Sequence, residues 1–145
     1  MFRRASTATI SRMQPEQIAA GLLDASLPQA EWTHRGHLTA AYVLISAHGP
    51  SATLALCRER IPLLNDAHGV ANSDTGGYHE TLTIFFVASV ADAIQRDLTI
   101  DETIAELDRN AALEWWSEPV LMSVEARRAF VAPDRAAPPF VLPAS

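Results

Sequence analysis

Three histidines and a glutamate stand at the start of apolar stretches of this chain. His34 and His37 occur in the run THRGHL, and His79 and Glu80 occur in YHETLT, which continues into IFFVASV. Imidazole and carboxylate groups are costly to bury without partners, so their position predicts a shared polar site at the edge of a core. Two imidazoles spaced i,i+3 share one face of a helix and can bind the same metal ion.

Three imidazoles and a carboxylate suit a divalent metal ion, namely zinc, iron, copper or manganese. The expected metal ligands are His34, His37, His79 and Glu80. Glu80 and His79 are also the expected catalytic residues, with Glu80 either binding the ion or acting as general base on a bound water. Aromatic and polar side chains nearby are expected to contact a substrate: Trp32, Arg58, Asn65, Tyr78 and Thr83.

The elements that must position these residues are helices, because apolar and polar residues do not alternate convincingly and several long segments suit helices. We expect an all-α, single-domain bundle of about five to six helices. Their expected ranges are about 15–27, 31–48, 51–66, 77–97, 99–116 and 123–130. We expect residues 1–13 to form an N-terminal tail, 14–131 the domain, and 132–145 a proline-rich, extended C-terminal tail.

The order of these helices predicts where the histidines lie. Short links favour antiparallel neighbours, so the second and fourth helices should run in the same direction and begin at the same end of the bundle. His34, His37 and His79 would then converge there. His48 closes the second helix at the opposite end.

Composition limits the function classes. A chain of 145 residues is about one domain, and its formal net charge of −6 provides no excess of positive charge for phosphates, so we expect no nucleic-acid partner. No apolar run approaches the roughly 18 residues of a membrane span, so we expect no membrane partner. A lone cysteine, Cys57, fits a reducing compartment and a cytoplasmic location, and we interpret it as an inert core residue. The oligomeric state is left open.

The function expected from these residues is a metal-dependent enzyme that acts on a small polar or carboxylate-bearing metabolite. One alternative is a metal-free acid–base enzyme that uses His79 or His37, oriented by Glu80, for proton transfer, elimination or hydrolysis. Another is a binding or sensor module for a small anion, without turnover. Glu80 has a purely structural alternative as well, as the capping-box residue of a helix that begins after Gly77.

Four stretches carry a resemblance: EWTHRGHL at 31–38, NDAHGVAN at 65–72, GYHETLT at 77–83 and VEARRAFVAPD at 124–134. They resemble a family of small uncharacterised bacterial all-helical proteins that pair an aromatic-x-His-x-x-His-Leu motif with Gly-Tyr-His-Glu-Thr, over about residues 27–134. The resemblance implies a site made of Trp32, His34, His37, Tyr78, His79, Glu80 and Thr83, and implies no particular reaction. Gly36 stands where the family pattern leads us to expect alanine or a larger residue, and its missing side chain is expected to loosen the turn between the two histidines.

Overall fold

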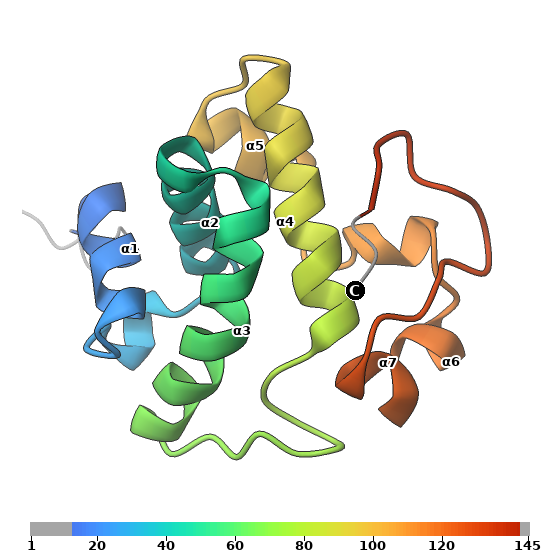
Figure 1. Cartoon of the computed structure of the whole chain (residues 1–145), viewed down its shortest axis with the longest axis horizontal. Helices are drawn as coiled ribbons and strands as arrows, with labels where there is room; N and C mark the ends of the chain where they lie inside the picture. Colours follow the sequence, from blue (N-terminus) through green and yellow to red (C-terminus); the bar gives the residue numbers. More distant parts are fainter. Residues whose placement is uncertain (1–12, 143–145) are drawn as a thin grey trace, which may run out of the picture.

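The computed structural model describes residues 13–142, which form helices and no strand. Within them lie α1 (Pro15–Leu23), η2 (Gln29–Glu31), α2 (His34–His48), α3 (Pro50–Ala67), α4 (Glu80–Gln95), α5 (Ile100–Glu106), η3 (Ala111–Glu114), α6 (Glu118–Leu121) and α7 (Val124–Arg128) (Figure 1). The predicted all-α bundle is therefore confirmed. Most of the predicted N-terminal tail, residues 1–12, lies outside the described residues.

Helices α2 and α5 begin directly after polar residues whose side chains cap them. The Thr33 hydroxyl accepts a hydrogen bond from the Gly36 amide and caps α2. Thr99 and Glu102 form a capping box at the start of α5, since each side chain accepts a bond from the other's backbone amide. These bonds satisfy amide groups that a helix start otherwise leaves without partners.

The segment after α5 departs from the prediction of one helix to about residue 116. α5 ends at Glu106, and the carboxylate of Asp108 then accepts a bond from the Asn110 amide at 2.7 Å. Asp side chains that bond to nearby amides compete with helical hydrogen bonding, so the chain turns here before η3. The short helix α6 was not predicted.

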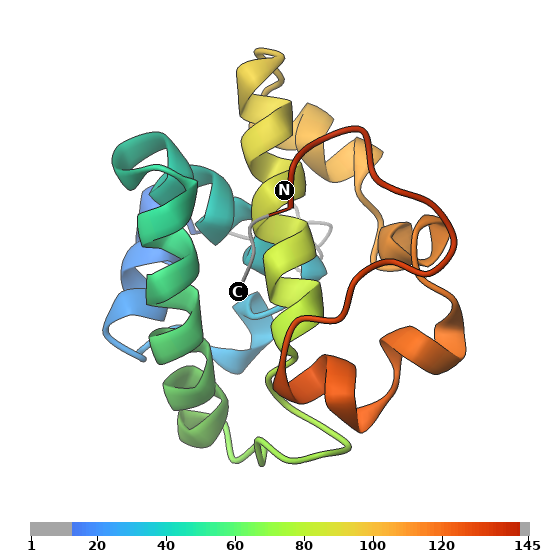
Figure 2. The same cartoon turned by 45° about the vertical axis from the view of Figure 1, so that its right-hand side comes forward.

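α4 lies at the centre of the molecule (Figures 1 and 2). On one side it packs against α2 and α3, and on the other it faces the C-terminal segment that contains α6 and α7. α2 and α3 are joined through Gly49 and run in opposite directions, whereas α2 and α4 run in the same direction (Figure 1). This is the predicted topology.

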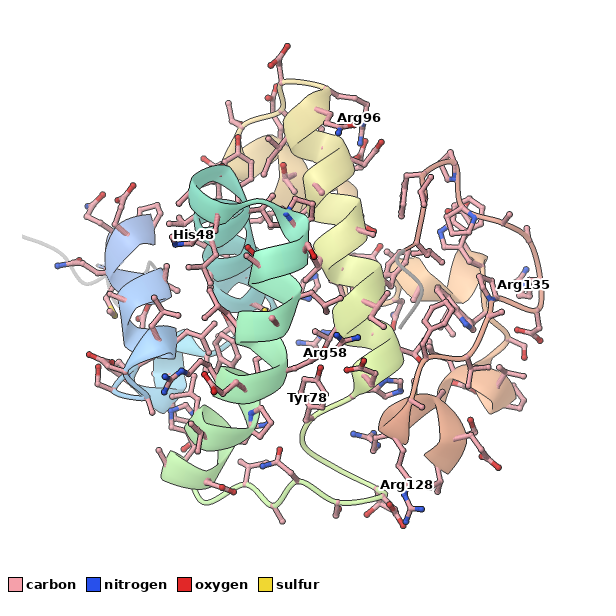
Figure 3. All side chains as sticks on the ribbon, in the orientation of Figure 1. His48, Arg58, Tyr78, Arg96, Arg128 and Arg135 are labelled. Atoms are coloured by element: carbon pink, nitrogen blue, oxygen red, sulfur yellow. The ribbon has the colours of Figure 1, made fainter. Side chains whose placement is uncertain are left out.

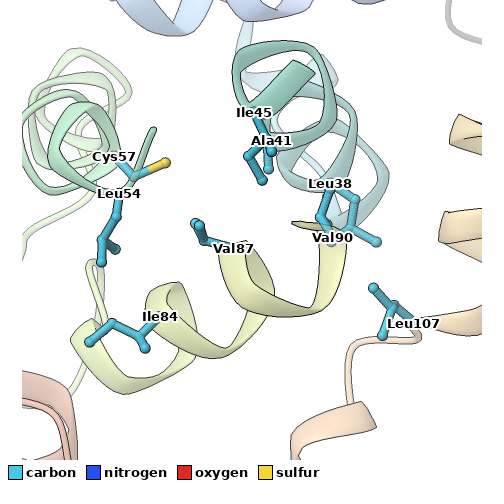
Figure 4. Packing of buried hydrophobic residues seen from close by; sticks show 9 residues of the cluster. All are labelled: Leu38, Ala41, Ile45, Leu54, Cys57, Ile84, Val87, Val90 and Leu107. Atoms are coloured by element: carbon cyan, nitrogen blue, oxygen red, sulfur yellow. The ribbon is translucent and has the colours of Figure 1, made fainter. Parts of the chain in front are cut away.

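The central core lies between α2, α3 and α4 (Figure 4). Its buried residues are Leu38, Ala41, Ile45, Leu54, Cys57, Ile84, Val87, Val90 and Leu107. A second group of buried side chains lies on the other side of α4, around Phe85 and Trp116. Residues 132–142 form no helix, and the ring of Phe140 lies 6.2 Å from that of Phe85. This part of the proline-rich segment is therefore packed against the domain.

Candidate functional site

A cavity of about 520 Å³ lies among α2, α3 and α4, and its walls are mainly apolar. The residues that the sequence singled out and that line it are Trp32, His34, His37, Asn65, Tyr78, His79 and Thr83. His34, His37 and His79 thus line one cavity. Arg58 and Glu80 are not among the lining residues.

The start of α2 is held close to η2 at a glycine. A Cβ atom built on Gly36 would lie 2.1 Å from the Glu31 carbonyl oxygen, which no real side chain tolerates. The turn that Gly36 permits carries Trp32, whose ring stacks on His37 with centroids 3.6 Å apart and planes 21° apart. The expectation that Gly36 loosens this turn is therefore wrong, because the glycine is what allows the close approach.

His37 lines the cavity and has one unprotonated ring nitrogen. Its Nδ1 donates to the Thr33 carbonyl at 2.7 Å, so the other nitrogen, Nε2, carries the lone pair of a neutral ring. His37 is an exposed residue whose ring lines the cavity, and desolvation of the ring lowers its pKa to about 4. Nε2 has no hydrogen-bond partner within residues 13–142. It is therefore a hydrogen-bond acceptor open to a ligand.

His34 connects α2 to the end of α5. Its Nε2 donates to the Leu107 carbonyl at 2.7 Å, and its ring lies edge-on to Phe86 with centroids 5.4 Å apart. Leu107 directly follows α5, so this bond fixes the turn that comes next in the chain. The second ring nitrogen, Nδ1, is left as an acceptor.

His79 is fully engaged by backbone groups. It is the N-cap of α4, where its Nδ1 accepts from the Leu82 amide at 3.2 Å. Its Nε2 donates to the Leu121 carbonyl at 2.8 Å, and burial lowers its pKa. Both nitrogens of the neutral ring are therefore occupied in folding contacts.

Glu80 is buried and is bonded to Arg58 and Tyr78, two side chains that Figure 3 shows near each other. The Arg58 guanidinium bonds to one carboxylate oxygen at 2.6 and 2.8 Å, and the Tyr78 hydroxyl donates to the other at 2.6 Å. Burial and this bond to Glu80 raise the pKa of Tyr78. α4 begins at Glu80 rather than near residue 77, so Glu80 occupies the first helical position and not the third that a capping box requires.

The loop from residue 68 to 79 is organised by Asn72. Its side-chain oxygen accepts from the Asn65 amide group at 2.9 Å and from the Tyr78 backbone amide at 3.0 Å, and its nitrogen donates to the Pro62 carbonyl. Gly77 has a φ of +78°, a conformation that favours glycine. The cavity wall at Asn65 and Tyr78 is thus held in place by hydrogen bonds.

The four predicted metal ligands are not arranged as a ligand set. Within residues 13–142 no group of three or more His, Cys, Asp and Glu side chains is placed to hold a metal ion. His79 offers no free nitrogen, and the oxygens of Glu80 are bonded to Arg58 and Tyr78. Metal binding by these four residues stays a prediction, and it would require His79 and Glu80 to give up these hydrogen bonds.

Among the lining residues that were not predicted to belong to a site, one carries a thiol and one carries a charge. Cys57 lines the cavity as a neutral thiol, because burial raises its pKa to about 11. Arg109 also lines the cavity, in the turn that follows Leu107. No local pattern in LDRNAAL marks this arginine, because only the bond from His34 and the end of α5 bring it to the cavity.

No described protein family, curated protein or solved structure matches this chain. Within the described range, no helix has both the length and the apolar character that crossing a membrane requires. Function is therefore inferred from the geometry of the cavity alone.

Proposed function

We propose that this protein binds a small, mainly apolar molecule that donates a hydrogen bond to His37. The observation that carries the proposal is the cavity of about 520 Å³, whose apolar walls include a few polar groups. Ligand sites typically have volumes of about 300–1,000 Å³ and the same mixture of apolar wall and sparse polar groups. The size of the cavity suits a ligand of metabolite dimensions.

The polar groups of the cavity indicate what the ligand must offer. His37 is neutral at physiological pH and can only accept through Nε2, because Nδ1 already donates to Thr33. The hydroxyl of Thr83 donates to the His79 carbonyl and also interacts with the Tyr78 hydroxyl, so it is engaged within the protein. A ligand with a hydroxyl or amine group would pair with Nε2 of His37, whereas a wholly apolar ligand would leave this acceptor without a partner.

A metal-free acid–base enzyme is the second candidate, and the free nitrogen of His37 favours it. A general base works best when its pKa lies near the operating pH. The pKa of His37, lowered to about 4, makes its ring a weak base at neutral pH. Binding is therefore the better supported function, and turnover would need a substrate that raises this pKa.

Ligand-observed NMR with a panel of small apolar fragments that carry hydroxyl or amine groups would test the proposal. Thr83→Phe fills part of the cavity, and Thr83→Val is its matched control because it has nearly the same volume as threonine. We expect fragment affinity to fall at least about tenfold in Thr83→Phe, equivalent to about 1.4 kcal/mol, and to change less than about threefold in Thr83→Val. Fragments that bind both variants equally, or no binding at all, would contradict the proposal.

The same samples separate binding from catalysis and from metal chemistry. Bound fragments are followed by NMR for hours, and conversion of one of them that is lost in His37→Phe would favour the acid–base enzyme. Zinc, iron, copper or manganese is added in turn while the melting temperature is measured. A stoichiometric ion whose thermal shift is lost in His34→Gln would favour the metal-dependent enzyme over a simple binding module.

A further inference from the structure

The cavity wall carries a positive charge and no negative charge. The lining residues include no aspartate or glutamate, and they include one arginine, Arg109. The chain as a whole carries a formal charge of −6, so a wall without carboxylates contrasts with the rest of the sequence. Glu80, the nearest acid in the sequence to the lining residues Tyr78 and His79, is neutralised by Arg58 and faces its own partners.

The guanidinium of Arg109 has no hydrogen bond or ion pair with another described residue. Other arginines of the described part do have such partners: Arg35 pairs with Asp101, Arg96 with Glu106, and Arg128 with Asp74. Arg109 is exposed and also lines the cavity, so its side chain lies where the cavity opens to solvent. Its positive charge is available to a ligand.

The backbone beside Arg109 is fixed. The Ala111 amide donates to the Asp108 carbonyl at 3.0 Å, which closes a turn with Arg109 inside it. Leu107, two residues before Arg109, is held by the hydrogen bond that its carbonyl accepts from His34. An arginine on a fixed turn loses less conformational freedom on pairing with a ligand than one on a loose chain.

We infer that the ligand of this cavity carries a carboxylate that pairs with Arg109. This inference rests on the proposed function and adds the chemical class of the ligand to it. The guanidinium matches a carboxylate with two parallel N–H to O bonds, and a single arginine balances one negative charge. The ligand is thus an amphipathic acid, with its carboxylate at the opening, its apolar body in the cavity and a hydroxyl or amine for His37.

The test uses 3-(4-hydroxyphenyl)propionate and its primary amide, which share a ring and a hydroxyl and differ in charge. Dissociation constants are measured by ligand-observed NMR at low ionic strength, where screening is weakest. We expect the carboxylate to bind the wild type at least about tenfold more tightly than the amide. In Arg109→Gln this preference should disappear through weaker binding of the carboxylate alone, and Arg109→Lys should retain part of it.

Arg35→Gln is the matched control, because it removes the same charge from the chain at an exposed residue outside the cavity wall. It should leave the preference for the carboxylate unchanged. Equal binding of carboxylate and amide, or a preference that survives in Arg109→Gln, would overturn the carboxylate inference and leave the binding function standing. Failure of both compounds to bind the wild type would count against the binding function and the inference together.

Discussion

The starts of α2 and α4 are similar in sequence and different in the use of their histidines. Each start brings a histidine to the same cavity. At α4, both nitrogens of His79 are bonded to backbone groups of Leu82 and Leu121. At α2, His37 uses one nitrogen for the Thr33 carbonyl and keeps the other free.

This difference separates a folding contact from a binding contact. A buried polar group whose hydrogen bonds are all made within the protein contributes to stability and has nothing left for a ligand. A polar group with an open acceptor in a cavity costs stability until a ligand pairs with it. Substitutions of His79 should therefore affect mainly folding, and those of His37 should affect mainly binding.

The largest loss of stability is expected for His79→Ala. The change removes a helix cap, which costs about 1 kcal/mol, and leaves the buried Leu121 carbonyl without its partner, which costs about 1–3 kcal/mol. We expect the free energy of unfolding, measured with urea, to fall by about 3 kcal/mol. His48→Ala, at the exposed end of α2, is the control and should change it by less than about 0.5 kcal/mol. A loss below about 1 kcal/mol in His79→Ala would show that His79 is not a folding contact.

Gly36→Ala should come next, because its Cβ would meet the Glu31 carbonyl oxygen at 2.1 Å. Overpacking of this kind costs about 1–3 kcal/mol. The displaced η2 would also move Trp32 off His37, so ligand affinity should fall along with the free energy of unfolding. Gly76→Ala is the control, since a Cβ there would meet its nearest neighbours at 3.9–4.0 Å and should be tolerated. Equal stability of the two variants would contradict the close approach.

Glu80→Gln should have a smaller effect on folding. A glutamine can still accept from Tyr78 but loses the charge that pairs with Arg58, and because the Arg58 side chain is 39% exposed we expect a loss of only about 1 kcal/mol. Affinity for the fragments should stay within about threefold of the wild type. Glu59→Gln, which alters an exposed pair with Arg60, should be neutral in both measurements. A tenfold loss of ligand or metal affinity with an intact fold would instead place Glu80 in the functional site.

His37→Phe should have the smallest effect on folding at pH 7, because phenylalanine can still stack on Trp32. The effect of this substitution on stability should appear at acidic pH. The pKa of His37 is about 4 in the folded protein and 6.5 in a model peptide, so between these values the unfolded chain binds the extra proton. The wild type is therefore stabilised fully above about pH 6.5 and loses this contribution as the pH falls towards 4.

Urea unfolding at pH 7 and pH 5 measures this difference. The wild type should lose more stability between the two values than His37→Phe does. The lowered pKa of His79 acts in the same direction and is present in both proteins, so it cancels in the comparison. Identical losses in the two proteins would show that His37 is protonated with equal ease in the folded and unfolded states.

The sequence by itself determined the approximate positions of α1 to α4, the start of α5 and the shared direction of α2 and α4. These features depend on local physics: Thr33 and Thr99 cap helices through their own neighbours, and Gly49 with Pro50 separates α2 from α3. Antiparallel packing through short links then places the starts of α2 and α4 near each other. This reasoning placed His34, His37 and His79 at the same end of the bundle, and all three line the cavity.

Only the tertiary structure decided what each of these side chains does. His34 bonds to a carbonyl 73 residues away, His79 to one 42 residues away, and Glu80 to an arginine 22 residues away. Spacing along a helix shows which face a side chain occupies but not which groups pack against that face. For the same reason Arg109 has no signal in the sequence, because the turn that carries it reaches the cavity only after α5 has packed against α2.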